Sequence, residues 1–277
     1  MFKDVMVHLD GSEEDEFRLR HAEAIAAGGQ SRIIGLYTNS LPEYAYVLAI
    51  QSGLAPMAPI IQLEERVRET GDRAISSLTE RCKRISVPTE ICRVEERASE
   101  VSTLCVSKAR CADLFVATAP YQREELPIWD ELAEAVMFEA GQGIYFVPRG
   151  AGARPVRSVL VAWRDTRESA RALAVALPFL KAATRTRIVI ADAPAATQEQ
   201  AKDLVAHLAR HGIKADVAAI ETGGKAVSDA LLNEAHGMGA DLIVMGAYGH
   251  SRFRERILGG VTREMIEKSD LPILIAH

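Results

Sequence analysis

The same order of apolar strands and helices occurs twice along this chain, and this duplication limits the folds that the chain can adopt. Residues 4–12 and 158–166 each form a short apolar stretch that ends in a polar turn suited to start a helix. Later in each copy, the segments ADLFV at 112–116 and ADLIV at 240–244 match almost letter for letter. Because self-similarity in a fixed order is the signature of a repeated architecture, we expect two copies of one domain.

Strands alternate with helices in both copies. Beyond the opening strands, we expect helices at residues 13–27, 61–85, 99–110, 167–182, 197–211, 226–236 and 261–268, and strands at 33–37, 89–94, 112–116, 143–147, 187–191, 214–220, 241–245 and 272–276. Strands this uniformly apolar are typical of parallel sheets with helices on both faces. A stretch rich in Gly, Pro and Arg at 148–155 predicts a linker, so the domains are expected at 1–148 and 156–277.

Composition narrows the classes of partner. The 277 residues carry a formal net charge of −5 and no long Lys or Arg run, which argues against nonspecific nucleic-acid binding. No apolar stretch in the sequence approaches the roughly 20 residues that cross a bilayer, and the first residues turn acidic before a signal-peptide core develops. We therefore expect a cytoplasmic protein that binds small ligands or proteins, without nucleic acid or membrane partners.

Two glycine corners frame a basic loop in the second copy. The corners follow the strand at 241–245, stand nine residues apart and consist of Gly246, Gly249, Gly259 and Gly260. Glycine lets backbone N–H groups approach an anion closely, and the start of the next helix adds free donors and a positive dipole end. With three arginines in the loop, at 252, 254 and 256, the pattern predicts phosphate binding; glycines that only turn the chain are the alternative.

This glycine signature, the strand before it and the closing segment Leu271–Ile275 together resemble the universal stress protein family in its tandem form, over essentially the whole chain. The resemblance implies an α/β fold of two tandem open five-stranded parallel sheets, each ordered 3-2-1-4-5 with helices on both faces. It also implies a nucleotide cleft where strands 1 and 4 diverge. Physical reasoning favours the same place, since ligands of open α/β sheets bind at the switch point beyond the strand carboxyl ends.

Carried over position by position, the resemblance implies ATP as the ligand, with Mg. The phosphate positions and the residues beside them are Met245, Gly246, Tyr248, Gly249, His250, Gly259, Gly260, Val261 and Thr262. The adenine and ribose positions are Trp163, Arg164 and Asp192. Trp163 is open to two interpretations, stacking on a base or packing beneath the turn.

Two residues depart from the family pattern. Gly260 stands where the family has Ser or Thr, so one hydroxyl contact to phosphate is missing, at a cost of about 1 kcal/mol. Arg164 stands where the family has an acidic residue, and arginine cannot accept a hydrogen bond from a ribose hydroxyl or an adenine amino group. Arg164 is free to pair with phosphate or with the neighbouring Asp165.

The first copy shows the reverse arrangement. It keeps the acidic residue, Asp10, but Thr118 and Tyr121 replace the first two glycines, and Asp130 and Glu131 lie where the second corner would be. Two carboxylates repel phosphate, and side chains block close approach of the backbone. We expect this half to bind no ATP by the family's route and to serve as a structural partner or as a site for another ligand.

Catalytic and metal motifs are weak. The segment Gly223–Lys225 resembles a P-loop, but Ala219 replaces the required earlier glycine and Ala226 the Mg-binding hydroxyl. The histidines are not spaced as metal ligands, and the four cysteines fit reduced packing thiols better than a zinc site. We expect little or no catalysis, at most slow ATP hydrolysis, and no metal site.

Three functions follow. The leading one is a stress-response or signalling module that binds ATP in its second half and presents a changed surface to a protein partner. The alternative is a nucleotide-free scaffold whose halves pair as an internal pseudo-dimer, because their apolar closing strands need covering; whole chains can pair as homodimers in the same way. The third is an enzyme on the same architecture, either flavoprotein-like or adenylating. Residues 39–59 form an insertion, read as a packed connector or as a ligand lid.

Overall fold

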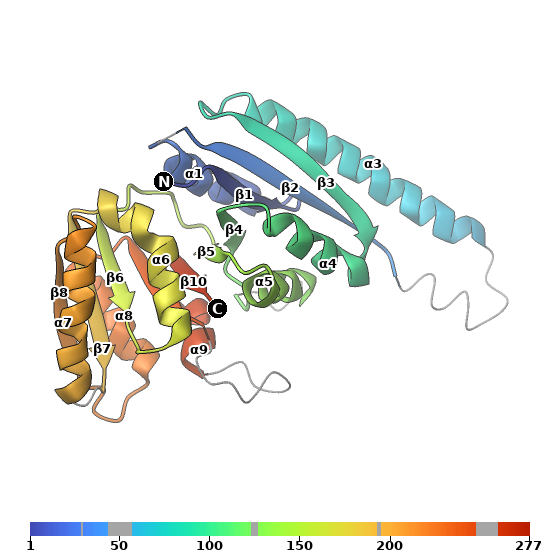
Figure 1. Ribbon diagram of the computed structural model, residues 1–277. Coiled ribbons are helices and arrows are strands. Elements are labelled where there is room, and N and C mark those ends of the chain that lie inside the picture. Colours follow the sequence, from blue (N-terminus) through green and yellow to red (C-terminus); the bar gives the residue numbers. More distant parts are fainter. Residues whose placement is uncertain (29, 44–56, 123–126, 193–194, 248–259) are drawn as a thin grey trace.

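The computed structural model describes residues 1–28, 30–43, 57–122, 127–192, 195–247 and 260–277. Figure 1 shows two groups of elements, one from each half of the chain, that meet at strands β5 (Gly143–Val147) and β10 (Ile273–Ala276). Both groups follow the predicted alternation of strands and helices.

The first half begins with the predicted short apolar strand and ends at β5. Its other elements are β1 (Asp4–Leu9), α1 (Glu14–Ala26), β2 (Arg32–Leu41), α3 (Met57–Cys82), β3 (Thr89–Arg97), α4 (Ala98–Ala109), β4 (Leu114–Thr118) and α5 (Pro127–Glu139). β2 and α3 both extend into the predicted insertion at 39–59. The remainder of that insertion, residues 44–56, lies outside the described residues.

The second half repeats this order and ends at β10. Its other elements are β6 (Ser158–Ala162), α6 (Arg167–Ala182), β7 (Arg185–Ala191), α7 (Ala195–Arg210), β8 (Ala215–Ile220), α8 (Val227–Met238), β9 (Leu242–Gly246) and α9 (Gly260–Lys268). Predicted and observed bounds differ by only a few residues at the ends of these elements.

All the strands belong to one ten-stranded sheet in the order β3-β2-β1-β4-β5-β10-β9-β6-β7-β8. Each half has the expected parallel order 3-2-1-4-5, and the α/β class is confirmed. The prediction of two separate sheets needs correction, because β5 and β10 pair antiparallel, with Tyr145 opposite Leu274. The physical reason is that both closing strands are buried and apolar, and each would otherwise leave an unpaired edge.

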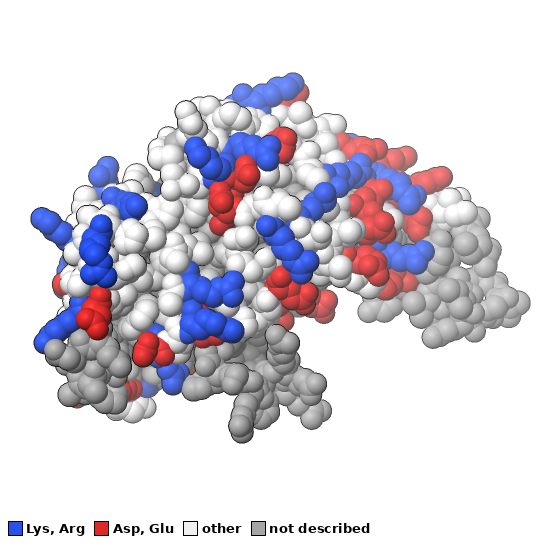
Figure 2. Space-filling view, in the orientation of Figure 1, with Lys and Arg blue, Asp and Glu red and all other residues white. Residues whose placement is uncertain are grey.

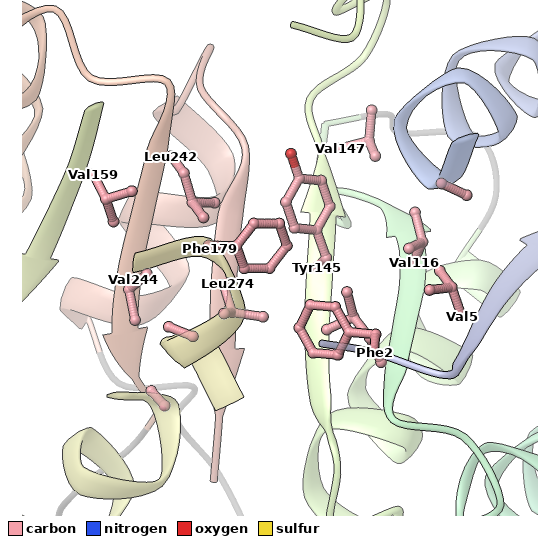
Figure 3. Close-up of a cluster of buried hydrophobic side chains, with 14 of the residues drawn as sticks. Phe2, Val5, Val116, Tyr145, Val147, Val159, Phe179, Leu242, Val244 and Leu274 are labelled. Atoms are coloured by element: carbon pink, nitrogen blue, oxygen red, sulfur yellow. The ribbon is translucent and has the colours of Figure 1, made fainter. Parts of the chain in front are cut away.

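The two halves also share their hydrophobic core. One cluster covers one face of the sheet and a second cluster the other face, and each contains residues from both halves. At the junction, Phe179 of α6 faces both Phe2 and Tyr145 of the first half, with ring centroids 5.3 and 5.9 Å away (Figure 3). Burial of such large side chains is the main favourable term in folding, so the junction is part of the core.

The repeated ADL segments have a structural role. The Asp113 carboxylate accepts the N–H groups of Lys3 at 2.6 Å and Asp4 at 3.0 Å. In the second half, the Asp241 carboxylate accepts the N–H groups of Arg157 and Ser158, both at 2.9 Å. Each aspartate thus satisfies backbone donors where the first strand of its own half enters the sheet, donors that would otherwise lack a protein partner.

Basic and acidic side chains are interspersed over the face of the molecule shown in Figure 2. The edge strand β3 carries part of this mixture, and its Arg93 forms ion pairs with Asp72 and Glu95. Charged side chains on an edge strand disfavour pairing with another sheet. None of the helices in the described part of the chain is long and apolar enough to cross a bilayer.

We predict that Asp241→Ala lowers the free energy of unfolding by about 1–3 kcal/mol, because two backbone donors lose a charged acceptor. Urea denaturation measures the loss. Asp113→Ala is the matched variant and should lose a similar amount, since its carboxylate makes the same two contacts. An unchanged midpoint for both variants would contradict this structural role.

Candidate functional site

The carboxyl ends of β6 and β9 form the switch point of the second half, because the helices that follow them cover opposite faces of the sheet. α6 contributes Phe179 to one hydrophobic cluster, whereas α9 contributes Met265 and Ile266 to the other. In open α/β sheets, ligands bind in the crevice at such a point. The predicted site residues that the structure describes end β9, follow β6 or β7, or open α9.

Gly246, the first glycine of the predicted loop, is required for packing. A Cβ built on Gly246 would lie 2.5 Å from the backbone nitrogen of Ser169 and 2.6 Å from the carbonyl carbon of Glu168. Gly246 does not take a left-handed φ. The end of β9 therefore lies directly against the first turn of α6, and the glycine is there because this helix approaches closely.

Two residues expected beside the ligand are packed into the protein. Met245 is 5% exposed and belongs to the cluster that contains Met265 of α9. Trp163 is partly buried against the other cluster. Of the two interpretations of Trp163, packing beneath the turn thus has a direct structural basis.

Asp192 and Arg164 lie at the same edge of the sheet but in different surroundings. Arg164 is exposed after β6. Asp192 follows β7 with φ +48, and its carboxylate accepts the N–H group and the hydroxyl of Thr222 at 2.8 and 2.6 Å. The hydroxyl of Thr222 holds the pKa of Asp192 below its usual value. Asp192 also borders an open hollow of about 610 Å³ formed with the end of β8 and with Gly223 and Gly224.

The first turn of α9 has backbone N–H groups that no described residue accepts. No acceptor among the described residues takes the backbone N–H groups of Gly260, Val261 or Thr262. Gly260 and Val261 are exposed, whereas Thr262 is 6% exposed. A Cβ on Gly260 would meet only Glu264 Oε1, at 3.6 Å. The other predicted residues of this loop, Tyr248, Gly249, His250 and Gly259, lie outside the described residues.

Sequence reasoning missed Glu168. This residue is 7% exposed in the first turn of α6, beside Gly246, and its carboxylate contacts Arg167 at 3.0 Å. Burial pushes the pKa of Glu168 up, but hydrogen bonds from its own N–H group, Arg167 and Thr166 outweigh this and hold the pKa below its usual value. An ionised carboxylate therefore lies at the N-terminus of α6. The signal was Thr166, the N-cap of α6, followed by an acidic residue in the first turn.

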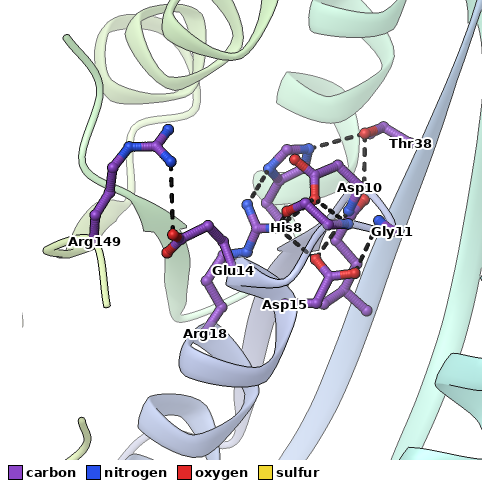
Figure 4. A network of polar contacts seen from close by, with 10 residues as sticks. His8, Asp10, Gly11, Glu14, Asp15, Arg18, Thr38 and Arg149 are labelled. Atoms are coloured by element: carbon purple, nitrogen blue, oxygen red, sulfur yellow. Dashed lines mark hydrogen bonds and ion pairs between the residues drawn. The ribbon is translucent and has the colours of Figure 1, made fainter. Parts of the chain in front are cut away.

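The switch point of the first half is filled by a charged network (Figure 4). Arg18, 2% exposed, donates to Asp10 at 2.6 Å and also contacts Asp15. Asp15 accepts the backbone N–H groups of Asp10 and Gly11 at 3.1 and 2.8 Å. One guanidinium thus serves two carboxylates, of which Asp10 has a lowered pKa, because the attraction of Arg18 and the other contacts outweigh its burial. Burial raises the pKa of Asp15 to about 6.

His8 extends this network and is neutral, since burial lowers its pKa to about 3. Arg18 lies 3.2 Å from His8 Nδ1 and can only donate, so Nδ1 accepts. His8 Nε2 then carries the proton and donates to the hydroxyl of Thr38 at 2.9 Å. The His8 ring also contacts Trp129, with centroids 4.9 Å apart.

The space that remains at this point is small. His8, Arg18, Trp129 and their neighbours enclose a cavity of about 30 Å³, which suits a single water molecule. Small-molecule sites commonly measure several hundred Å³. The described residues of the first half therefore leave little space at this point.

Tyr121 keeps a backbone conformation that glycine favours. It stands where the second copy has Gly249, and its φ is +65. A left-handed conformation is uncommon for a residue with a Cβ and persists where surrounding contacts hold it. Here the Asp130 carboxylate accepts the Tyr121 N–H group at 3.1 Å, and the Tyr121 hydroxyl contacts Glu134.

The fold and its two switch points define a tandem protein built from two doubly wound α/β halves. Residues 155–277 match the model of the universal stress protein family. The family domain thus lies in the second half, and the first half repeats its fold. A search among curated proteins found no match to the chain.

Solved structures extend the likeness to both halves. A universal stress protein from Archaeoglobus fulgidus DSM 4304 has a TM-score of 0.75 at 15% identity, with 99% of this chain and 95% of that chain covered. A functionally unknown protein from Pseudomonas aeruginosa PAO1 has a TM-score of 0.60 at 11% identity, with 99% and 92% covered. At these identities the likeness establishes the fold alone.

We predict opposite effects for alanine at two glycines of the second half. Gly246→Ala should destabilise the protein by about 1–3 kcal/mol, because a methyl group has no space beside α6. Gly260→Ala should be neutral or stabilising by up to about 1 kcal/mol, since its site is open and its φ suits any residue. Thermal and urea unfolding measure both. Equal stability of the two variants would show that Gly246 is not a packing residue.

The charged network predicts a pH dependence of stability. The folded pKa of Asp15 is about 6 and its ordinary value is 3.8, so between these values the folded state binds more protons than the unfolded state. The contribution of Asp15 to stability is therefore greatest below pH ~4 and falls as the pH rises to ~6. Asp10, with its lowered pKa, adds no slope in this window, whereas His8, whose folded pKa is about 3 against an ordinary 6.5, adds a slope of the opposite sign.

Asp15→Asn should remove the contribution of Asp15 to this pH dependence and leave that of His8. Free energies of unfolding of wild type and variant at several values between pH 4 and 7 measure it. The difference between the two proteins should change across the window. A constant difference would mean that Asp15 titrates normally.

Proposed function

We propose that the second half binds an adenine nucleotide, ATP with Mg, at the edge of the sheet where β6 and β9 end. The chain then acts as a cytoplasmic stress-response or signalling module with little or no turnover, and nucleotide occupancy changes the surface offered to a protein partner. In this proposal, residues 1–148 form a domain that supports the binding domain at 156–277.

The observation that carries the proposal is the open first turn of α9. Its N–H groups at Gly260, Val261 and Thr262 have no acceptor among the described residues. Free donors at a helix start, together with the positive end of the helix dipole, are suited to phosphate oxygens. Thr262 adds a hydroxyl in the same turn.

Glu168 orients the proposed ligand. Its ionised carboxylate already lies at the start of α6 and repels phosphate there, so the phosphates belong near α9. The same carboxylate can accept a hydrogen bond from a ribose hydroxyl, which Arg164 cannot do. The loss of the acidic residue after the first strand is thus offset within the same cleft. Tyr248, Gly249, His250 and Gly259 remain predicted phosphate-side residues.

A second function is favoured by the joined sheet. The pairing of β5 with β10 and the shared core fit a nucleotide-free scaffold in which the halves form an internal pseudo-dimer. Native mass spectrometry of the gently purified protein separates the two functions. An additional mass equal to a nucleotide supports binding, whereas a bare chain that also gains no mass from added Mg-ATP supports the scaffold.

The test of binding removes one donor and keeps the fold. Gly260→Pro deletes the N–H group of the first residue of α9, where proline is well tolerated. Gly260→Ala retains that N–H group and is the matched control. Titration calorimetry with Mg-ATP should show wild-type affinity for Gly260→Ala and about tenfold weaker binding for Gly260→Pro, the effect expected for one charge-assisted hydrogen bond.

Two outcomes would contradict the proposal. If wild type gives no heat with Mg-ATP, the second half is not an ATP site. If both variants bind as wild type does, the phosphates are not held at the start of α9. Circular dichroism of Gly260→Pro confirms that the helix is retained.

A further inference from the structure

Gln122 of the first half caps the last turn of α9 in the second half. Its side-chain Nε2 donates to the carbonyl oxygen of Ile266 at 2.9 Å and lies 3.5 Å from those of Glu267 and Ser269. Its Oε1 accepts the N–H group of Arg149 at 3.3 Å. The carbonyls at the end of a helix have no intrahelical partner, so a side chain from the other half completes this helix.

Tyr121, the preceding residue, adds a second contact to the same helix. The guanidinium carbon of Arg263, in α9, lies 4.8 Å from the centre of the Tyr121 ring. The left-handed backbone of Tyr121 and the contacts of its N–H group and hydroxyl with α5 fix this ring in place. We call Tyr121 and Gln122 the α9 clamp.

The clamp and the candidate phosphate site lie at opposite ends of one short helix. α9 has nine residues, a length of about 13 Å. Its first turn holds Gly260 and Thr262, and its last turn meets Gln122. The loop that carries the clamp also lines the small cavity of the first half, through Ala119 and Pro120. A rigid helix transmits a shift at one end to the other.

We propose that Tyr121 and Gln122 are positioning residues for the nucleotide site of the second half. They hold α9 where the donors of its first turn meet the phosphates, and in this way the first half sets the nucleotide affinity of the second. This inference rests on the proposed function. It assigns a task to the half that has lost the glycine pattern.

The test compares two side chains that cap helix carbonyls. Gln122→Ala removes the cap from α9. Arg110→Ala removes the matching cap from α5, where Arg110 donates to the carbonyl oxygen of Glu139 at 3.3 and 3.2 Å. With full-length protein, Gln122→Ala should bind Mg-ATP about three- to tenfold more weakly than wild type, the effect expected for one hydrogen bond. Arg110→Ala should bind as wild type does.

Hydrogen exchange distinguishes positioning of the nucleotide site from a purely structural role of Gln122, because only the former makes exchange near Gln122 depend on nucleotide. Because coupling between sites is reciprocal, saturating Mg-ATP should slow exchange of the amides of Ala119, Tyr121 and residue 122 in wild type, and this effect should be lost in Gln122→Ala. Without nucleotide, amides of α9 should exchange faster in Gln122→Ala and at the wild-type rate in Arg110→Ala.

The outcomes separate the two proposals. If wild type does not bind Mg-ATP, the proposed function fails. If wild type binds and Gln122→Ala binds equally well, or if both capping variants weaken binding equally, the clamp has no special role and the inference is overturned. Gln122→Glu is the second variant. A carboxylate that faces the same carbonyl oxygens should weaken Mg-ATP binding at least as much as alanine does. Wild-type affinity of Gln122→Glu would also overturn the inference.

Discussion

The antiparallel pairing of β5 with β10 is the interaction on which the rest of this structure depends. It converts two open sheets into one and brings Phe179 into the core of the other half. Because the two strands run in opposite directions, the carboxyl edges of the halves point in opposite directions as well. A helix that begins at the cleft of one half therefore ends beside the cleft of the other, and this places the last turn of α9 against Gln122.

Much of this arrangement could be predicted from the sequence, because the elements are set by local periodicity and the internal repeat is strong. The strand order in each half, which the family resemblance implied, is confirmed. Pairing of the two halves through their apolar closing strands was one of the alternatives, but the continuous ten-stranded sheet was not part of the predicted fold, since nothing local tells whether an apolar edge pairs within the chain or between chains. The reason for Gly246 was also missed: it depends on how closely α6 approaches, and Glu168 became visible only through the same contact.

The two halves have the same fold but different side chains at their switch points. In the second, the end of β9 meets α6 through a glycine, and no described residue accepts the first N–H groups of α9. In the first, Thr118 and Tyr121 replace glycines, and Arg18 draws two carboxylates into the cleft. Yet Asp113 and Asp241 make the same backbone contacts. The features that build the sheet are thus repeated in both halves, whereas those that could admit a ligand differ.

The position of β10 in the chain has a consequence for biosynthesis. The ribosome releases the first half before α6 and β10 exist, so the outer edge of β5 and the faces of Phe2 and Tyr145 stay uncovered while the second half is being made. Nascent chains with such surfaces are prone to associate wrongly. β10 closes this edge, and the nascent chain therefore completes its sheet only after the other elements of the second half have been made.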